Sequence, residues 1–198
     1  MSLLLHFDCD IVEAGIDEAG RGCLAGPVVA AAVILPPNYL DPGLNDSKKL
    51  SAAKRKILRE NIIASAIAWN VGIISADRID EINILNATFE AMHEAANGLQ
   101  VKPQSLLIDG NRFKPFQDIP HQCITGGDAK YAAIAAASIL AKTIRDDIME
   151  ILHHQYPIYG WDTNKGYGTK AHVQAIFASG RTPYHRKSFQ VPAQLKLF

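Results

Sequence analysis

The chain has 198 residues, which suits one domain, and 48% of them are hydrophobic, which excludes a largely disordered protein. Twenty lysines and arginines balance twenty acids, so net charge alone does not indicate a polyanion partner. Three cysteines far apart in the sequence exclude a disulfide framework and favour a reducing compartment. No segment has the pattern of a signal peptide or of a membrane-spanning helix, so we expect a cytoplasmic protein with no membrane partner.

Apolar periodicity, turn residues and cap residues predict the elements in chain order. The first half contains a strand over residues 12–17, a buried strand over 27–35, a helix over 51–64 capped by Ser51, a strand over 67–74 and a helical segment in two pieces over 75–97. The second half contains a strand over 105–109, an edge strand over 121–125, a long helix over 129–154, a helix over 172–179 and an irregular stretch from residue 183. This order predicts an α/β domain with a mixed sheet.

The charges are unevenly distributed along this chain. Residues 163–198 contain six lysines and arginines and no acid, and residues 48–59 contain another six without an acid. This asymmetry predicts an acidic cation site beside basic surfaces that bind a polyanion. The alternative for each basic cluster is a solvated helix face.

Four acids follow predicted strands or precede the long helix. Asp17 and Glu18 end the first strand, Asp109 ends the strand over 105–109, and Asp128 follows two glycines. In open α/β sheets, ligands bind beyond the carboxyl ends of the strands. Clustered carboxylates repel one another, and a divalent cation such as Mg²⁺ removes that cost. The pattern therefore predicts a metal site, and carboxylate ligands without histidine or cysteine suit two-metal phosphoryl transfer.

Simpler roles remain open for some of these acids. Adjacent residues of a regular strand face opposite sides, so Asp17 and Glu18 share a site only if the strand ends there, as Gly20 and Gly22 suggest. Asp128 has an alternative role as the N-cap of the long helix. Asp109 with Gly110 has an alternative as an ordinary turn. Neither a P-loop nor a Gly-x-Ser-x-Gly motif is present.

A set of motifs resembles the type 2 ribonuclease H family, specifically bacterial ribonuclease HII. They run in family order from residue 15 to about 188 and comprise Gly15-Ile16-Asp17-Glu18-Ala19-Gly20-Arg21-Gly22, Asp46-Ser47-Lys48-Lys49-Leu50, Leu107-Ile108-Asp109-Gly110, Gly127-Asp128, Ala135-Ala136-Ala137-Ser138-Ile139-Leu140-Ala141-Lys142, Lys165-Gly166-Tyr167-Gly168-Thr169 and His172. The resemblance implies a ribonuclease H-like fold, a five-stranded mixed sheet flanked by helices with a small helical C-terminal extension. It implies a catalytic domain over residues 1–190, helical from about 155, and a flexible tail over 191–198.

The resemblance also implies the activity. It is metal-dependent cleavage of RNA in RNA/DNA hybrids and at single ribonucleotides in duplex DNA, on the 5′ side of the ribonucleotide, leaving a 3′-hydroxyl and a 5′-phosphate. Asp17, Glu18, Asp109 and Asp128 are then the catalytic ligands of two Mg²⁺ or Mn²⁺ ions. Roles in ribonucleotide excision repair and DNA replication follow, and we expect a monomer.

The family pattern assigns the nucleic-acid contacts as well. The Gly20-Arg21-Gly22 turn contacts the ribose 2′-hydroxyl through its backbone, because glycine permits close approach. Tyr167 packs on the following sugar. Ser47, Lys48 and Lys49 contact phosphates, and Lys142 lies on the helix that faces the site. The alternative for Lys142 is a surface lysine, and the alternative for Tyr167 is a half-buried side chain in a glycine-flanked turn. Asp146 and Asp147 are expected to be solvated.

The C-terminus carries a second motif. Gln194-Leu195-Lys196-Leu197-Phe198 resembles the peptide by which bacterial proteins bind the sliding clamp, with Gln194 as polar anchor and Leu195, Leu197 and Phe198 as apolar contacts. The alternative is a frayed terminus or one folded back onto the domain.

Two other functions compete with ribonuclease activity. One is a nuclease of related fold that acts on DNA junctions or ends, which the Gly-Arg-Gly turn and Tyr167 disfavour. The other is a non-catalytic nucleic-acid binding module, which the four acids disfavour because an uncompensated anionic cluster repels phosphate.

Overall fold

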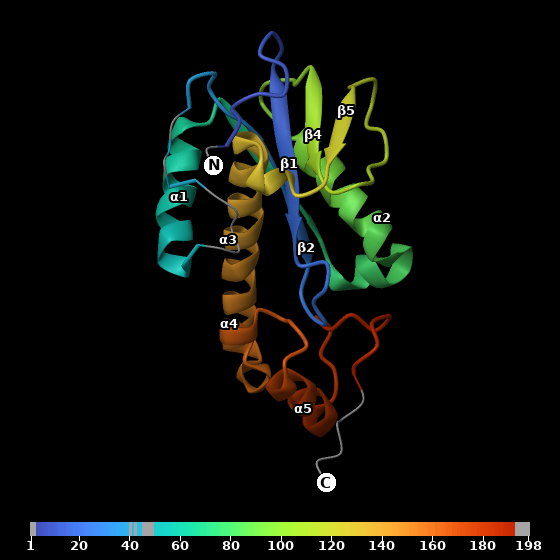
Figure 1. The fold of residues 1–198 in the computed structure, drawn as a ribbon. Coiled ribbons are helices and arrows are strands. Elements are labelled where there is room, and N and C mark those ends of the chain that lie inside the picture. Colours follow the sequence, from blue (N-terminus) through green and yellow to red (C-terminus); the bar gives the residue numbers. More distant parts are fainter. Residues whose placement is uncertain (1–2, 40, 42, 45–49, 193–198) are drawn as a thin grey trace.

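The computed structural model describes residues 3–39, 41, 43–44 and 50–192 (Figure 1). Its sheet has the strand order β3-β2-β1-β4-β5. The strands are β1 (Glu13–Ala19), β2 (Val28–Ile34), β3 (Ala68–Ile74), β4 (Ser105–Asp109) and β5 (His121–Ile124). β1, β2 and β3 pair antiparallel, whereas β4 and β5 run parallel to β1. The predicted mixed sheet with an edge strand at 121–125 is confirmed.

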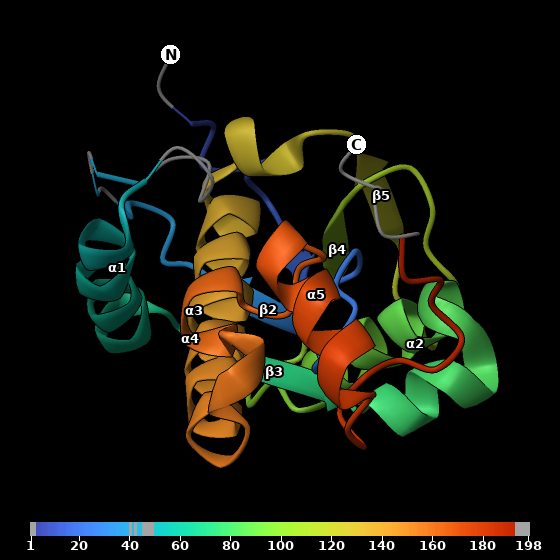
Figure 2. The ribbon, with the colours of Figure 1, turned by 90° about the horizontal axis from the view of Figure 1, so that it is seen from below.

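Helices cover both faces of this sheet (Figure 2). They are α1 (Ala52–Ser65), α2 (Ala76–Asn97), α3 (Ala132–Gln155), α4 (Trp161–Asn164) and α5 (Lys170–Ser179), with the 3-10 helices η2 (Gly127–Ala129) and η3 (Pro157–Tyr159). The Ser51 side chain caps α1 by accepting from the Lys54 N–H at 3.3 Å, as predicted. Asn83 has φ 66° and divides α2, which confirms the two helical pieces.

Side chains alternate between the two faces along the strands. Ala14, Ile16 and Ile108 belong to the core cluster that packs under α2. The residues of the other face pack under α1 and α3. Gly15 lies on that second face, and a Cβ there would come within 2.2 Å of the Ala133 carbonyl carbon. The glycine therefore lets α3 lie directly on β1.

The C-terminal part forms a third cluster at the end of α3. Trp161 packs there with Met149 and Leu24, and the chain from residue 183 onward is irregular, as expected. The short helices η3 and α4 lie in this part, for which the family resemblance implies a helical extension from about residue 155 without the bounds of single helices. Among the helices of the described ranges, none has the length and apolar character to span a membrane.

Two details differ from the sequence prediction. The first strand does not end at Asp17, because β2 continues to pair with it as far as Ala19. The long helix begins at Ala132 and its N-cap residue is Tyr131, so Asp128 does not cap it. Asp128 lies instead in η2, a separate turn before the helix.

Candidate functional site

Asp17 and Asp109 lie next to each other because of the register between β1 and β4. The last parallel pair of the two strands is Ile16 with Ile108, and the two acids are the next residue of each strand. Both acids follow the alternation onto the face covered by α3. Asp17 is only 5% exposed.

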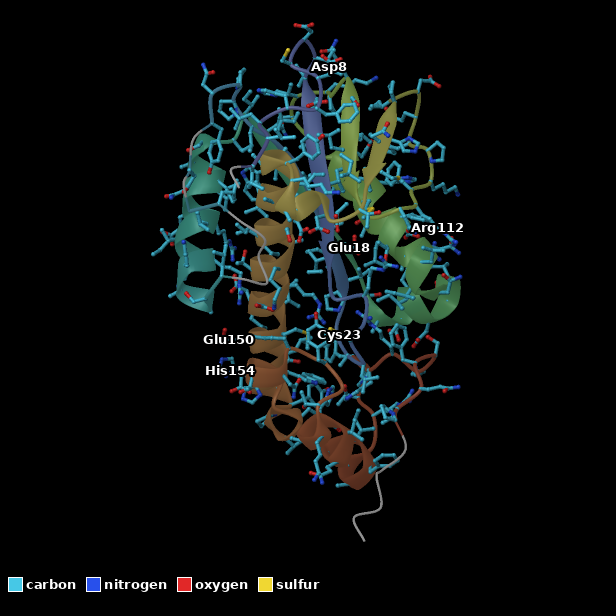
Figure 3. All side chains as sticks on the ribbon, in the orientation of Figure 1. Asp8, Glu18, Cys23, Arg112, Glu150 and His154 are labelled. Atoms are coloured by element: carbon cyan, nitrogen blue, oxygen red, sulfur yellow. The ribbon has the colours of Figure 1, made fainter. Side chains whose placement is uncertain are left out.

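Glu18 faces the other side of the sheet, because the strand continues past Asp17. It lies at the middle of the molecule in Figure 3 and lines a cavity of about 340 Å³ that Asp109 and residues of α2 also line. Its Oε1 accepts from Arg21 Nη1 at 3.0 Å. The expected strand end at Asp17 is therefore wrong, and Glu18 approaches the site around the end of β4 rather than from the same face.

Asp128 is connected to Asp109 through the backbone of η2. The Gly127 N–H donates to Asp109 Oδ1 at 2.7 Å. Asp128 follows directly and is buried. The turn after β5 thus brings the fourth predicted acid to the end of β4.

The electrostatics of the site centre on Asp17. Burial, followed by the negative charges of Glu18 and Asp109, raises the pKa of Asp17 well above 3.8, while a hydrogen bond from Ser138 of α3 lowers it. The charges of both neighbouring acids therefore act on the Asp17 carboxylate. A hard cation would remove this repulsion, and the donors are all carboxylate oxygens, which fits Mg²⁺ or Mn²⁺.

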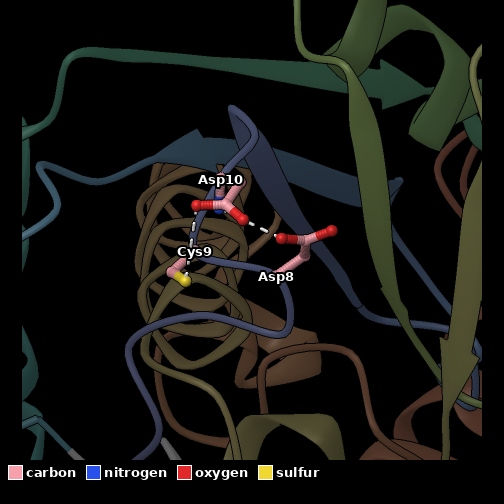
Figure 4. Close-up of side chains that lie close together, drawn as sticks. All are labelled: Asp8, Cys9 and Asp10. Atoms are coloured by element: carbon pink, nitrogen blue, oxygen red, sulfur yellow. Dashed lines mark hydrogen bonds between the residues drawn. The ribbon is translucent and has the colours of Figure 1, made fainter.

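The acids are close neighbours, but they are not preassembled as a tight cluster. Within the described ranges, the group of three ligands whose donor atoms all lie within 4.8 Å of one another is Asp8, Cys9 and Asp10, not a set from Asp17, Glu18, Asp109 and Asp128. That group is exposed on the loop before β1 (Figure 4). Exposed acids often gather in this way without a cation, so we assign it no role.

Two buried arginines from distant segments bind backbone carbonyls in and beside the turn that follows β1. Arg186 donates to the carbonyl oxygens of Gly20 at 2.7 Å and Arg21 at 2.9 Å. Arg145 of α3 donates to the carbonyls of Ala25, Pro27 and Lys165. Both arginine side chains are about 1% exposed.

The two glycines of this turn have different reasons to be glycine. Gly20 has φ +95°, and a Cβ there would lie 2.0 Å from Arg145 Nε. The chain itself therefore requires Gly20. Around Gly22 a Cβ would meet no atom within 4 Å, and Gly22 is exposed. Nothing in the described fold requires Gly22, and its backbone is open to an approaching ligand.

Tyr167 lies beside this turn. Its phenol and the Cys23 thiol share a hydrogen bond, and burial raises the pKa of both groups. The residue remains 45% exposed. The structure thus brings Tyr167 next to the residue that follows Gly22 and leaves part of the ring accessible.

A buried histidine pair fixes the backbone of Tyr167. His172 Nδ1 lies 2.8 Å from the Tyr167 carbonyl oxygen, so this nitrogen donates. His172 Nε2 then accepts from Trp161 Nε1 at 3.0 Å and from His185 Nε2 at 3.1 Å. His185 Nδ1 accepts the Thr182 N–H at 2.9 Å. These partners assign one neutral tautomer to each ring, and burial lowers both pKa values, that of His185 to about 4.

Lys142 and the two neighbouring acids lie farther along α3. Lys142 pairs with Asp146, and its charge also acts on Cys23. Asp147 pairs with Arg59 of α1 and is 59% exposed. The residues Ser47, Lys48 and Lys49, and the tail residues Gln194, Leu195, Leu197 and Phe198, lie outside the described residues.

The sequence did not identify the roles of Arg145, Arg186, His172 and His185. Arg186 was counted in a basic cluster, and the charge pattern cannot separate a buried arginine from a surface one. The available signal is the pair His185-Arg186 within a stretch that the sequence predicts to be irregular. These side chains need hydrogen-bond partners inside the protein only if the stretch is buried, and the local sequence does not show that it is.

A second groove continues from the cavity beside Glu18. Phe89 and Arg112 line both spaces, and the second one measures about 630 Å³. Lys114 and His121 also line it, and no acid is among the described residues that form its wall. Arg112 lies on the side of Glu18 that faces β5 and α2 (Figure 3). A cationic path therefore leads away from the acids.

The strand order, with adjacent acids Asp17 of β1 and Asp109 of β4, defines the class of ribonuclease H-like α/β proteins. The model of the family "Ribonuclease HII" matches residues 14–191. A ribonuclease HII of Bacteroides fragilis is 59% identical over 198 residues, covering 99% of this chain and 98% of that protein. The chain therefore belongs to the ribonuclease HII family and is a ribonuclease H.

Solved structures agree with this fold. The ribonuclease HII of Archaeoglobus fulgidus, solved in complex with PCNA, has a TM-score of 0.76 at 28% identity, with 90% of this chain and 95% of that chain covered. Bst-RNase HIII, solved in complex with Mn²⁺, has a TM-score of 0.68 at 17% identity, with 90% and 67% covered. At that identity the second likeness concerns the fold alone.

Proposed function

We propose that this chain cleaves RNA in RNA/DNA hybrids and at single ribonucleotides in duplex DNA, on the 5′ side of the ribonucleotide. The products are a 3′-hydroxyl and a 5′-phosphate. The observation that carries this proposal is the position of Asp17 and Asp109 next to each other on the neighbouring strands β1 and β4, shortly before the turn after β1, where the space around the Gly22 Cα is open. An acid suited to bind a hard cation therefore lies a few residues from a backbone segment that a ligand can approach closely.

Asp17, Glu18, Asp109 and Asp128 would hold one or two divalent ions, Mg²⁺ or Mn²⁺. When bound, these ions supply the Lewis acidity that activates water and stabilises the leaving oxygen. Asp17 supports this role because its repulsion with Glu18 and Asp109 is relieved when a cation is bound. Ser138 holds the Asp17 carboxylate in place by a hydrogen bond.

The substrate contacts follow from the surroundings of the acids. The Gly20–Gly22 turn contacts the 2′-hydroxyl, and Tyr167 packs on the next sugar. The exposed Arg21 guanidinium, the cationic groove at Arg112, and Lys142 are proposed as contacts to phosphates of the same strand. Ser47, Lys48 and Lys49 are proposed as further phosphate contacts on the basis of the family pattern.

Product mapping on a duplex with one embedded ribonucleotide tests this function. We expect a single cut on the 5′ side of the ribonucleotide with Mg²⁺ or Mn²⁺, and no cut in a matched all-DNA duplex or with a chelator. Cleavage of both duplexes would favour a DNA nuclease of related fold. Binding that persists without metal and without products would favour a binding module.

We also propose that the C-terminal Gln194-Leu195-Lys196-Leu197-Phe198 peptide binds the sliding clamp. The complex of the Archaeoglobus fulgidus relative with PCNA supports this proposal. Deletion of residues 194–198 is expected to abolish co-elution with the clamp and to leave cleavage of short duplexes unchanged. Co-elution of the truncated chain would contradict it.

A further inference from the structure

One guanidinium, that of Arg186, binds the carbonyl oxygens of the Gly20–Gly22 turn. Arg186 Nη2 and Nη1 donate to two successive carbonyl oxygens, those of Gly20 and Arg21. Its Nε donates to the Gly26 carbonyl at 3.0 Å, and its guanidinium carbon lies 5.0 Å from the centre of the Phe189 ring. Contacts on three sides fix the plane of the guanidinium.

These hydrogen bonds also fix where the amide groups of the turn point. In a trans peptide the N–H is directed opposite to the C=O, and no peptide bond is cis in the described chain. With the Gly20 and Arg21 carbonyls directed at Arg186, the N–H groups of Arg21 and Gly22 point away from it. Arg186 is buried, whereas Arg21 and Gly22 are exposed. Both amide groups are therefore presented to the outside of the turn.

The space around the Gly22 Cα is open. Gly22 is not held at a positive φ, and a Cβ on it would meet no atom of the described protein within 4 Å. The Cα side of Gly22 is therefore unobstructed, and the two residues that carry these N–H groups are exposed. Two successive backbone N–H donors on an exposed turn are suited to an oxygen acceptor.

We propose that Arg186 is a positioning residue for sugar recognition, which orients the Arg21 and Gly22 N–H groups as donors to the ribose 2′-hydroxyl. This inference rests on the proposed function, since it assumes that the turn meets a ribonucleotide. The role requires arginine: its planar fork reaches two adjacent carbonyls, whereas lysine carries a compact ammonium on a flexible stem.

Arg145 provides a matched control within the same fold. It is as buried as Arg186, and its guanidinium also donates to backbone carbonyls. Its acceptors are Ala25, Pro27 and Lys165, not Gly20 or Arg21. Arg145→Lys should therefore disturb the packing beside the turn without releasing the two carbonyls that set the amide direction.

The test is the binding preference for a single ribonucleotide. Fluorescence anisotropy would give the Kd of two duplexes that differ in one 2′-hydroxyl, with Ca²⁺ present and the absence of product verified on a gel. We expect wild type to prefer the ribonucleotide duplex and Arg186→Lys to reduce that preference about tenfold, the worth of one or two hydrogen bonds. In Arg145→Lys the ratio of the two Kd values should stay within about twofold of the wild-type ratio.

The outcomes separate this inference from the function on which it rests. If wild type shows no preference, the proposed function of the turn fails. If wild type shows it and Arg186→Lys retains it fully, the positioning role is overturned. In case Arg186→Lys does not fold, amide NMR on the wild type decides: Arg21 and Gly22 signals should shift with the ribonucleotide duplex much more than with the all-DNA duplex, and equal shifts would overturn the proposal.

Discussion

Asp17 and Arg186 are both buried charges, but the chain satisfies them in opposite ways. Arg186 and its neighbour Arg145 donate to carbonyl oxygens of the chain itself, so each guanidinium is satisfied within the fold. Asp17 lies beside two acids, Glu18 and Asp109, which raise its pKa further. The cationic region is complete without a ligand, whereas the acidic region stores repulsion that a divalent cation would relieve. The difference indicates that the arginines build the site and the acids perform its chemistry.

The largest expected effect is the loss of cleavage when Asp17 of the acidic region is replaced. Asp17→Asn should lower cleavage by at least about a thousandfold, equivalent to about 4 kcal/mol of transition-state stabilisation, because it removes the acid that both neighbours flank. Stability should be unchanged or higher, since a like charge is removed from a buried site. Cleavage assays and thermal melts measure the two effects. Asp147→Asn, an exposed ion-paired acid on α3, is the control and should retain full turnover.

The next largest effect is the loss of stability when Arg145 of the cationic region is replaced. Arg145→Met should reduce the free energy of unfolding by about 3 kcal/mol, because the Ala25 and Lys165 carbonyls lose their donor and the Pro27 carbonyl keeps only Arg186. Urea unfolding measures it. Arg59→Met removes only a surface pair with Asp147 and should cost less than about 1 kcal/mol. Equal losses for the two variants would show that Arg145 is not a structural centre of this region.

The histidine pair beside the arginines predicts a pH dependence. In the unfolded chain a histidine titrates near pH 6.5, whereas burial lowers the pKa of folded His185 to about 4. Between these values the unfolded state binds more protons, so stability is full above pH 6.5 and is lost as the pH falls toward 4. We expect His185→Gln to remove about 2 kcal/mol of this loss. The exposed His154→Gln, compared by urea unfolding at pH 7 and pH 4.5, should behave like wild type.

The smallest expected effect is the stabilisation of the folded protein by a bound metal ion. Mg²⁺ or Mn²⁺ at about five times its Kd should stabilise wild type by about 1 kcal/mol, which corresponds to a rise of about 2–4 °C in Tm. Inorganic phosphate should have no such effect through the buried arginines, because their donors are already used. Loss of the metal shift in Asp17→Asn would agree with its role, and a full shift in that variant would argue against it.

Much of this architecture could be predicted from residue patterns. The alternation and turn residues predicted all five strands, and Ser51 and Ser75 marked helix starts that the structure confirms. The helix at 172–179 was also predicted, although its first turn begins earlier, at Lys170, behind the Thr169 cap. Such signals are local, because hydrogen-bond caps and apolar periods depend on neighbours within one or two turns.

The face on which Glu18 lies could not be predicted in this way. The glycines after β1 suggested an early strand end, but the pairing of Ala19 with Val29 extends the strand, and only the neighbouring strand supplies those hydrogen bonds. The same holds for Asp128, whose position depends on the Gly127 N–H reaching Asp109 across 18 residues.

The sequence by itself determined the elements, the strand-end acids and the family, because these depend on residue type and spacing along the chain. Only the tertiary structure decided which acids share a face and which cations are buried beneath the Gly20–Gly22 turn. The physical reason is that a charge finds its partner through space: Arg186 meets the Gly20 carbonyl 166 residues away, and nothing near either residue in the sequence marks that contact.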